Sequence, residues 1–361
     1  MLTQRFRFPL VVTTLLLALQ LGMTLPVAAQ GATPAASPGA GADVKQVAVV
    51  TPASRTNQGW DQQAADAITA VGKEMGIDVQ VAENAGYEDI TPVLKDLAAG
   101  GADLIICHAS GYQTVCPEFA QENDVKVAVI ENQAAVTPNL ISDIETQAQE
   151  VAYLAGVLAG DTTKTGTVGV VVSGEPPTWN YMTTGFAEGL KAAKPDAKLL
   201  YSVIGEAAYD DAAGAKRVTE QQLAANADVI FGMGDGASFG MIQAIEDHNA
   251  KAGADQVKFI DVIGDKSQEH GKSLLSSVLF DYSGIYRQMI DDIRNGTFGK
   301  TYTMDLKNDG VRLLDLPKDV AEKTKTDVET ARQDIIDGKV KVSAIADADA
   351  MKKRIDELFP K

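Results

Sequence analysis

The sequence of 361 residues has few of the side chains that catalytic and metal sites use most often. It has two cysteines, Cys107 and Cys116, and three histidines, His108, His248 and His270. Because their spacing does not match that of zinc ligands, we expect no metal and no cofactor. The sequence also lacks a G-x-S-x-G nucleophile elbow, a Walker A motif and any evident nucleophile paired with a base. These absences argue against an enzyme.

Basic residues are also scarce. The chain has 32 Lys and Arg against 49 Asp and Glu, a formal net charge of −17. Removing an N-terminal leader with two arginines and no acid would change this value to −19. Such a charge repels phosphate backbones and anionic lipid head groups, so we expect no nucleic acid and no membrane surface among the partners.

The first 44 residues predict an exported protein. Two arginines, the apolar run "LVVTTLLLALQLGMTL" and the small residues of "PVAAQG" are typical of a signal peptide over 1–29, cut after Ala29. An uncleaved anchor is the alternative, because the run nearly suffices to span a bilayer. Residues 30–44 are rich in Ala, Pro, Ser and Gly, which is typical of a flexible linker. We therefore expect the protein on the periplasmic or extracellular side of the membrane.

Cysteine placement bears on anchoring and on disulfides. No cysteine lies near the leader, so we do not expect a lipid anchor on an N-terminal cysteine. In an exported chain, Cys107 and Cys116 either form a local disulfide or remain as two thiols.

The remaining residues, roughly 315, exceed what one hydrophobic core usually holds, which indicates two lobes. Short runs such as "KQVAVV", "DLIICH" and "VKVAVIE" alternate with helical stretches, the pattern of βαβ units around a parallel sheet. The pattern resumes with "TVGVVVS", "AKLLYSVI", "DVIFGM" and "VKFIDVIG". Residues 101–132 also resemble residues 226–264, which favours two similar α/β lobes.

Three turns each follow the carboxyl end of a predicted strand. They are "ASRTNQGW", "CHASGY" and "GMGDGASF". Ligands of parallel sheets bind beyond the carboxyl ends of the strands, so these turns predict the rim of a cleft between the lobes. Trp60, one of only two tryptophans, lies in the first of these turns.

Four stretches carry a specific resemblance: "QEVAYLAGVLAGDTTKTGTVGVV", "YMTTGFAEGLKAAKPDAKLLYS", "DVIFGMGDGASFGMIQAIED" and "VIGDKSQ". They resemble the basic membrane protein (BMP, PnrA-like) family of ABC-transporter substrate-binding proteins over most of residues 45–300. The resemblance implies an α/β fold of two Rossmann-like lobes, that of a type I periplasmic binding protein, joined by three crossings. It also implies a small-molecule ligand, most often a purine nucleoside, and delivery to an ABC transporter permease.

On this basis we expect lobe 1 to comprise residues 45–140 and about 283–302, and lobe 2 to comprise residues 141–280. Residues 303–361 are expected to form a hinge return and C-terminal helices. The three crossings are expected near residues 138–146, 276–282 and 300–312, and the protein is expected to be a monomer.

The resemblance also implies binding residues in the first lobe. "NQGWDQ" takes the place of a family motif whose phenylalanine stacks on the base, so Trp60 is predicted to stack, with Asn57, Asp61 and Gln62 beside it. The alternative is that Trp60 is a hydrophobic staple or a lid over the core. Ser110 and Tyr112 are predicted to line the neighbouring turn.

Further binding residues are predicted from the second lobe. Asp265 matches a family aspartate whose carboxylate can accept hydrogen bonds from ribose hydroxyls; a helix N-cap is the alternative. Gly234 and Asp235 match a Gly-Gly-Thr-Gly turn, in which Asp235 replaces an uncharged residue. Trp179 and Asn180, which follow "GEPP", are predicted to close the cleft from the opposite side. The two prolines of this stretch are equally compatible with an ordinary turn.

One family feature is missing. After "SLLSSVL" the nucleoside-binding members commonly have a lysine, whereas this chain has Phe280 and Asp281. Phe280 is predicted to supply a second stacking face. The loss of the lysine leaves open a ligand other than the usual purine nucleoside.

Other classes of protein compete with this interpretation. A binding protein for a sugar or another small ligand would share the fold. "GMGDGA" satisfies the G-x-G-x-x-A pattern of a dinucleotide-dependent oxidoreductase, but it lies several elements into its lobe, not in the first βα unit. The ligand-sensing domain of a repressor would need a helix-turn-helix before the first lobe, where this chain has a predicted leader and linker.

Overall fold

The structure is a computed structural model that describes residues 41–254 and 256–360. The predicted leader, and the predicted linker up to residue 40, lie outside the described residues. No helix among the described residues combines the length and apolar character needed to cross a membrane.

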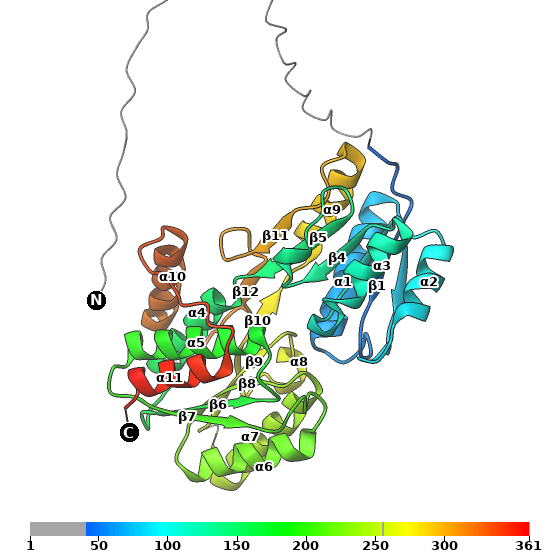
Figure 1. The fold of residues 1–361 in the computed structure, drawn as a ribbon. Coiled ribbons are helices and arrows are strands. Elements are labelled where there is room, and N and C mark those ends of the chain that lie inside the picture. The colour runs from blue at the N-terminus through cyan, green and yellow to red at the C-terminus, as the bar shows by residue number, and fades with distance from the viewer. Residues whose placement is uncertain (1–40, 255, 361) are drawn as a thin grey trace, which may run out of the picture. The chain divides into compact units, whose positions relative to one another are not determined.

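Two six-stranded sheets organise this part of the chain (Figure 1). The first sheet has the order β11-β5-β4-β3-β1-β2, and all of its pairs are parallel. Its strands are β1 (Gln46–Val50), β2 (Asp78–Ala82), β3 (Leu104–Cys107), β4 (Val127–Ile130), β5 (Ile141–Thr146) and β11 (Thr301–Met304). Strands β3 and β4 are apolar and buried throughout, as expected of central parallel strands with both faces covered.

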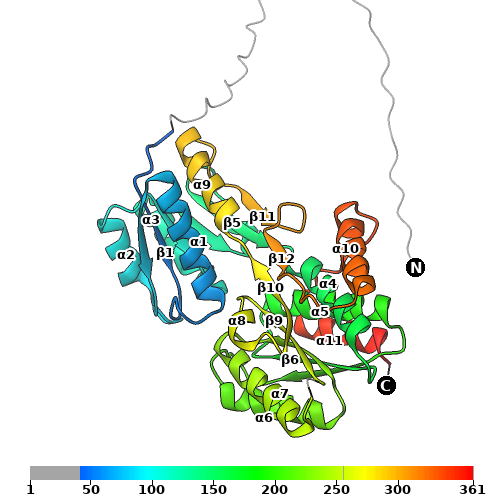
Figure 2. The ribbon, with the colours of Figure 1, turned by 180° about the vertical axis from the view of Figure 1, so that it is seen from behind.

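Four helices cover the first sheet. Helices α1 (Trp60–Met75) and α9 (Ser283–Asn295) pack together on one face, and α2 (Thr91–Ala99) and α3 (Val115–Asn123) pack together on the other (Figure 2). Strand β1 shows why: Val47 and Val49 join the core under α1, while Ala48 and Val50 join the core under α2. The alternation of side chains along a strand thus supplies both cores.

The second sheet has the order β12-β10-β9-β8-β6-β7, in which only the β10–β12 pair is antiparallel. Its strands are β6 (Thr167–Val172), β7 (Lys198–Val203), β8 (Val229–Met233), β9 (Lys258–Val262), β10 (Leu274–Phe280) and β12 (Val311–Leu313). Its helices are α4 (Ala148–Thr162), α5 (Pro177–Ala193), α6 (Ala212–Ala224), α7 (Ser238–Ala252) and the short α8 (Ser267–His270). Helices α4 and α5 pack against each other, as do α6 and α7.

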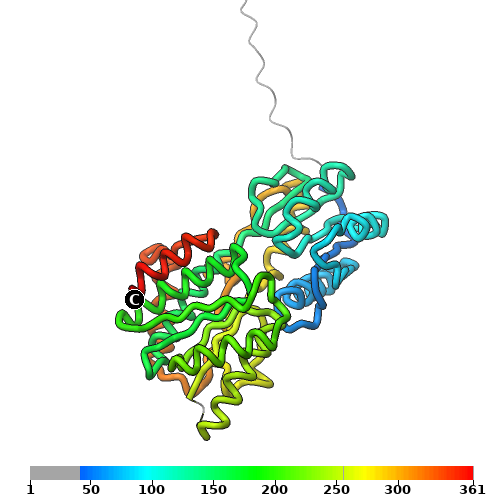
Figure 3. The backbone as a smooth tube through the Cα atoms, turned by 60° about the horizontal axis from the view of Figure 1, so that its bottom comes forward, coloured from blue at the N-terminus to red at the C-terminus, as the bar shows by residue number. Residues whose placement is uncertain are grey.

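The two C-terminal helices extend the second lobe. Helix α10 (Glu322–Ile336) packs on α4, and α11 (Ala348–Leu358) lies along α5 (Figure 3). Glu188 of α5 accepts hydrogen bonds from Arg354 at 2.8 Å and from the Ser343 hydroxyl at 2.7 Å. These contacts fasten the C-terminal segment to lobe 2. The predicted fold class, with two Rossmann-like lobes and C-terminal helices, is confirmed.

Three connections join the two sheets. Gln147 lies between β5 and α4, residues 281–282 lie between β10 and α9, and residues 305–310 lie between β11 and β12. The Gln147 N–H donates to the Met304 carbonyl at 2.8 Å, so the first and third connections lie side by side.

Sheet membership differs from the expected lobe boundaries at two strands. Residues 141–146 were assigned to lobe 2, but Val127 of β4 is in register with Ile141, which makes β5 a strand of the first sheet. Residues 303–361 were assigned to the hinge return and C-terminal helices, but β12 pairs with β10 in the second sheet. Both strands flank a connection, where sequence pattern does not reveal which sheet a strand joins.

The two cysteines form a disulfide. Cys107 is the last residue of β3, and Cys116 lies in the first turn of α3. The bond therefore fixes the turn at residues 108–115, which lies at the carboxyl end of the first sheet.

Candidate functional site

A cavity of about 50 Å³ lies between the carboxyl ends of the two sheets. Its walls are Trp60, Tyr87, Ala109, Ser110, Ile130, Pro176, Thr178, Trp179, Tyr209 and Asp235. Four of these side chains are aromatic, and none is a lysine, an arginine or a histidine. The cavity is therefore a mainly aromatic space with one carboxylate, at the place where α/β folds of this kind bind ligands.

Trp60 is the first residue of α1 and lies half-buried at the wall of this cavity. Its ring stacks on His108 with 4.6 Å between centroids, and its indole N–H donates to the His108 carbonyl at 3.3 Å. Phe280 and Tyr282 meet the indole in edge-to-face contacts at 5.7 and 6.0 Å. These contacts hold the indole in a fixed orientation while it still lines the cavity.

His108 acts as a support for Trp60. The side chain is fully buried, and burial lowers its pKa to about 3, so the imidazole is neutral. Its Nε2 lies 3.2 Å from the Trp60 carbonyl oxygen, which can only accept, so Nε2 carries the proton. Sequence reasoning considered His108 only as a metal ligand and missed this positioning role.

The predicted polar residues around Trp60 hold its loop and do not line the cavity. The Asp61 carboxylate accepts from the Ala53 N–H at 3.1 Å and from the Asn57 amide at 2.7 Å. Burial raises the pKa of Asp61, and these two hydrogen bonds lower it in part. Gln62 accepts from the Gln58 N–H at 2.9 Å. The turn that carries Trp60 is therefore stabilised by its own side chains.

Hydrogen bonds link the two lobes around the cavity. The Trp60 N–H donates to Asp235 Oδ1 at 3.3 Å, and the Lys266 ammonium donates to the Gln58 carbonyl at 3.0 Å. On the other side, the Thr178 hydroxyl donates to Glu131 Oε1 at 2.7 Å. These contacts keep the lobes close in this structure.

Lys266 is a buried cation that sequence reasoning did not identify. Its side chain is fully buried and pairs with Asp261 Oδ2 at 2.6 Å, while Asp261 Oδ1 accepts from the Ser238 hydroxyl at 2.8 Å. Neither residue lines the cavity, but both influence the pKa of Asp235 in its wall. The pair fixes the loop after β9, whose Gly264 has φ of 130° and leaves no room for a side chain beside the Gln58 carbonyl.

Asp235 lies in the turn between β8 and α7, in a short 3₁₀ segment over Asp235–Ala237. Its φ is 47°, a left-handed conformation that aspartate adopts more readily than most residues. Burial and the nearby Asp61 raise the pKa of Asp235 to about 7. Gly234 allows the tight turn, since a side chain there would collide with the Ser238 N–H at 2.7 Å.

The remaining predicted residues have different surroundings. Ser110 is exposed and lines the cavity, and Trp179 is buried beside it with its indole N–H donating to the Ser173 hydroxyl at 3.0 Å. Tyr112 is buried behind the rim and donates to the Gly86 carbonyl at 2.6 Å.

Three further predicted residues lie outside the cavity wall. Asn180 donates to the Ala346 carbonyl at 2.6 Å, a contact with the C-terminal segment. Phe280 meets the Trp60 ring edge-to-face and does not line the cavity. Asp265 is exposed and accepts from the Ser267 N–H at 2.9 Å in an Asx turn, whereas the N-cap of α8 is Lys266. The structure does not bring Asp265 to the cavity.

Six residues of the wall were not predicted from the sequence: Tyr87, Ala109, Ile130, Pro176, Thr178 and Tyr209. Tyr87 follows β2 and Tyr209 follows β7, each within a few residues of the strand end. The rule that selected the other turns, that ligands bind beyond the carboxyl ends of strands, applies equally to these two segments.

Three carboxylates gather behind Thr178 in the first lobe. Burial raises the pKa of Glu131, of Asp143 and of Glu145, and the neighbouring Asp143 helps to raise that of Glu145 to about 7. Their side chains do not form a metal site: across residues 41–254 and 256–360, no three His, Cys, Asp or Glu side chains are arranged to hold an ion.

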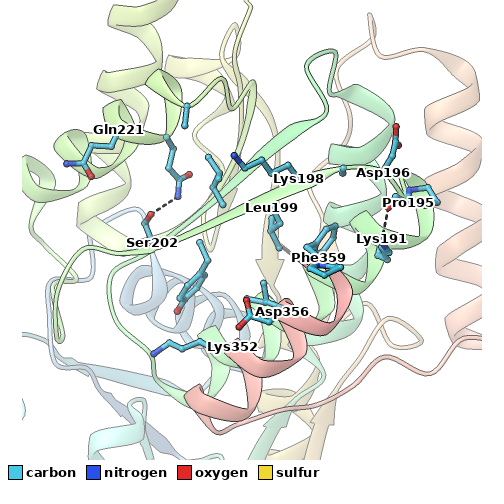
Figure 4. Close-up of a pocket in the computed structure, with 17 residues that line it drawn as sticks. Lys191, Pro195, Asp196, Lys198, Leu199, Ser202, Gln221, Lys352, Asp356 and Phe359 are labelled. Atoms are coloured by element: carbon cyan, nitrogen blue, oxygen red, sulfur yellow. Dashed lines mark hydrogen bonds between the residues drawn. The ribbon is translucent and has the colours of Figure 1, made fainter.

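A larger groove of about 1150 Å³ runs along the outer edge of the second sheet (Figure 4). Its walls come from α5, β7, α6 and α11, and include Lys198, Leu199, Ser202, Gln221 and Phe359. It contains none of the predicted site residues and exceeds the usual size of ligand pockets, roughly 300 to 1,000 Å³. The predicted residues therefore indicate the cavity between the lobes, not this groove, as the candidate site.

The family model for the Bmp family, described as "ABC transporter substrate-binding protein PnrA-like", matches residues 44–346. The chain belongs to this family. Members are extracytoplasmic substrate-binding components of ABC transporters, so this Bmp-family protein binds a small molecule and partners with a permease. The predicted family is confirmed.

Individual relatives are distant. The chain is 27% identical over 320 residues to the "ABC transporter nucleoside-binding protein BmpA" of Lactococcus lactis, covering 82% of this chain and 88% of that one. Among solved structures, an ABC transporter solute-binding protein from Aeropyrum pernix matches with a TM-score of 0.75 at 21% identity, over 87% and 97% of the two chains. Another from Conexibacter woesei matches with a TM-score of 0.70 at 22% identity, over 84% and 100%. These structures support the fold.

Proposed function

We propose that this Bmp-family protein binds a nucleoside, with purine nucleosides favoured, and presents it to the permease of an ABC importer. The carrying observation is the aromatic wall between the lobes, in which Trp60 is held against His108 and also lines the cavity. A flat aromatic ring stacks on a nucleobase with a contribution of roughly 1–3 kcal/mol. The Lactococcus lactis relative, named a nucleoside-binding protein, supports the same ligand class.

Ligand entry requires the lobes to move apart. The cavity of about 50 Å³ is far smaller than the roughly 300 Å³ at which ligand pockets begin. The three connections between the sheets would serve as the hinge, because only a few residues there need to change their backbone angles. The hydrogen bonds of Asp235, Lys266 and Thr178 across the cleft would break and re-form in each cycle.

Dinucleotide binding at the "GMGDGA" turn fits poorly. In a dinucleotide site this turn approaches a pyrophosphate, and here it carries the carboxyl group of Asp235. We propose that the protein acts by binding alone, as a monomer.

A thermal-shift panel on the mature protein tests the proposal. At a ligand concentration of ~100 times the dissociation constant, binding adds about 2.7 kcal/mol to the free energy of unfolding, a shift of a few degrees. We expect at least one nucleoside to raise the midpoint, while hexoses and pentoses leave it unchanged. A shift with free sugars alone would instead assign the cavity to a sugar.

A further inference from the structure

The carboxyl group of Asp235 has an unused acceptor in the cavity. Its Oδ1 accepts from the Trp60 N–H, whereas Oδ2 accepts no hydrogen bond from any residue that the structure describes. A carboxylate oxygen has two acceptor positions, so Oδ1 also retains capacity. Because the bond to Trp60 comes from the residue whose ring forms the proposed stacking surface, Asp235 lies beside that surface.

No cation of the cavity wall compensates this carboxylate. The wall contains no lysine, arginine or histidine, and the buried Lys266 already binds Asp261 and the Gln58 carbonyl. Asp61 adds a second negative charge nearby, with both of its oxygens occupied. A ligand that brings N–H donors would therefore be favoured here, and one that brings only acceptors or a negative charge would be rejected.

We propose that Asp235 makes this site selective for nucleosides whose base presents adjacent N–H donors, as guanine does with its ring N–H and exocyclic amine. This inference rests on the proposed nucleoside function. Two neighbouring N–H groups can reach one carboxylate together, and such paired, charge-assisted bonds discriminate between bases by about 5- to 150-fold. In the Gly-Gly-Thr-Gly turn of the family, the residue that corresponds to Asp235 is uncharged. The selectivity would therefore be a property of this chain.

The proton equilibrium of Asp235 gives the inference a second readout. Burial and Asp61 disfavour its ionised form, and the Trp60 N–H and Lys266 favour it. Other titratable groups that face it are Asp261, Tyr87, Tyr209 and Tyr282. Since N–H donors bind the ionised carboxylate, guanosine affinity should rise with pH through the range in which Asp235 loses its proton.

Calorimetric titration with guanosine, inosine, adenosine and uridine tests the inference. Inosine keeps the ring N–H and lacks the exocyclic amine, and adenosine lacks the ring N–H. We expect guanosine to bind most tightly and inosine next. In Asp235→Asn, guanosine affinity should fall about 5- to 150-fold, and adenosine affinity should change far less. The control Asp78→Asn removes the same charge at the exposed start of β2 and should leave all affinities unchanged.

The outcomes separate the two proposals. If no nucleoside binds, the proposed function fails. If nucleosides bind without a preference for guanosine, or if Asp235→Asn weakens all of them equally, Asp235 does not read the base and the inference is overturned. The wild-type protein alone provides a further test, because the ratio of guanosine to adenosine affinity should rise between about pH 6 and pH 8. A constant ratio would contradict the inference even if Asp235→Asn did not fold.

Discussion

Replacement of Trp60 by alanine should weaken nucleoside binding and also destabilise the fold. The indole packs on His108, meets Phe280 and Tyr282 edge-to-face, and donates to the His108 carbonyl. A fully buried Trp→Ala change costs about 3–5 kcal/mol of unfolding free energy, and half-burial of Trp60 reduces this to about 2–3 kcal/mol. The lost stacking should weaken ligand binding by about 1–3 kcal/mol, or 5- to 150-fold.

Two further variants separate these effects. Trp60→Phe retains a stacking ring and loses the N–H bond to His108, so it should bind within about fivefold of the wild type. Phe186→Leu changes a fully buried ring that stacks on Phe231 at 4.5 Å. Because Phe186 does not line the cavity, this variant should lose about 1–2 kcal/mol of unfolding free energy and keep its affinity.

Denaturant unfolding and calorimetric titration on the same preparations give both quantities. Affinities are compared under conditions in which each variant is fully folded. A folded Trp60→Ala protein with wild-type nucleoside affinity would refute the stacking role and leave Trp60 as a lid over the core, the alternative that the sequence left open.

Three further predictions concern the surroundings of the cavity. Lys266→Met should lower the free energy of unfolding by about 3–5 kcal/mol because it leaves Asp261 buried and unpaired, and adding Asp261→Leu should recover most of it in denaturant titrations. Gly264→Ala should reduce ligand affinity, because the new side chain would collide with the Gln58 carbonyl of the opposite lobe. The control Gly253→Ala, also at positive φ but with no neighbour within 4 Å, should leave the affinity unchanged. Equal affinities of the two variants in calorimetric titration would refute the prediction. In the folded state the pKa of Glu145 is raised from 4.5 to about 7, so between these values the folded protein keeps a proton that the unfolded chain has released. The free energy of unfolding therefore falls as pH rises through this range. Glu145→Gln should flatten that fall in melting curves recorded at several pH values.

Much of the fold could be predicted because its signals are local. Strands β3 and β4 are short apolar runs, and helix α3 lies between them, so the alternation of βα units is visible without any tertiary information. The expected ranges placed β5 in lobe 2 and β12 in neither lobe, whereas β5 pairs with β4 and β12 with β10. Sheet membership depends on the pairing partner, which the segment itself does not reveal. Register Val127↔Ile141 has no signature in either segment alone.

The candidate site was predictable to a similar depth. Trp60, Ser110, Trp179 and Asp235 were predicted from the turns after strands and from the family resemblance, and all four line the cavity. Whether a polar side chain faces the ligand or its own loop could not be predicted from the sequence. Asp61 turned inward to its own loop, in contacts four and eight residues away, and such local satisfaction cannot be distinguished from ligand binding by residue type.

The position of His108 shows why the sequence could not reveal how Trp60 is held. His108 follows β3, 48 residues beyond Trp60, yet the two exchange backbone and side-chain hydrogen bonds in both directions. The disulfide of Cys107 fixes the backbone immediately before His108, and burial keeps its ring neutral, so it can donate to the Trp60 carbonyl at any ordinary pH. The stacking surface thus depends on the turn after β3 as much as on its own loop. The aromatic residue that the sequence makes conspicuous is positioned by a neutral histidine that composition alone would assign to a metal site or to no role.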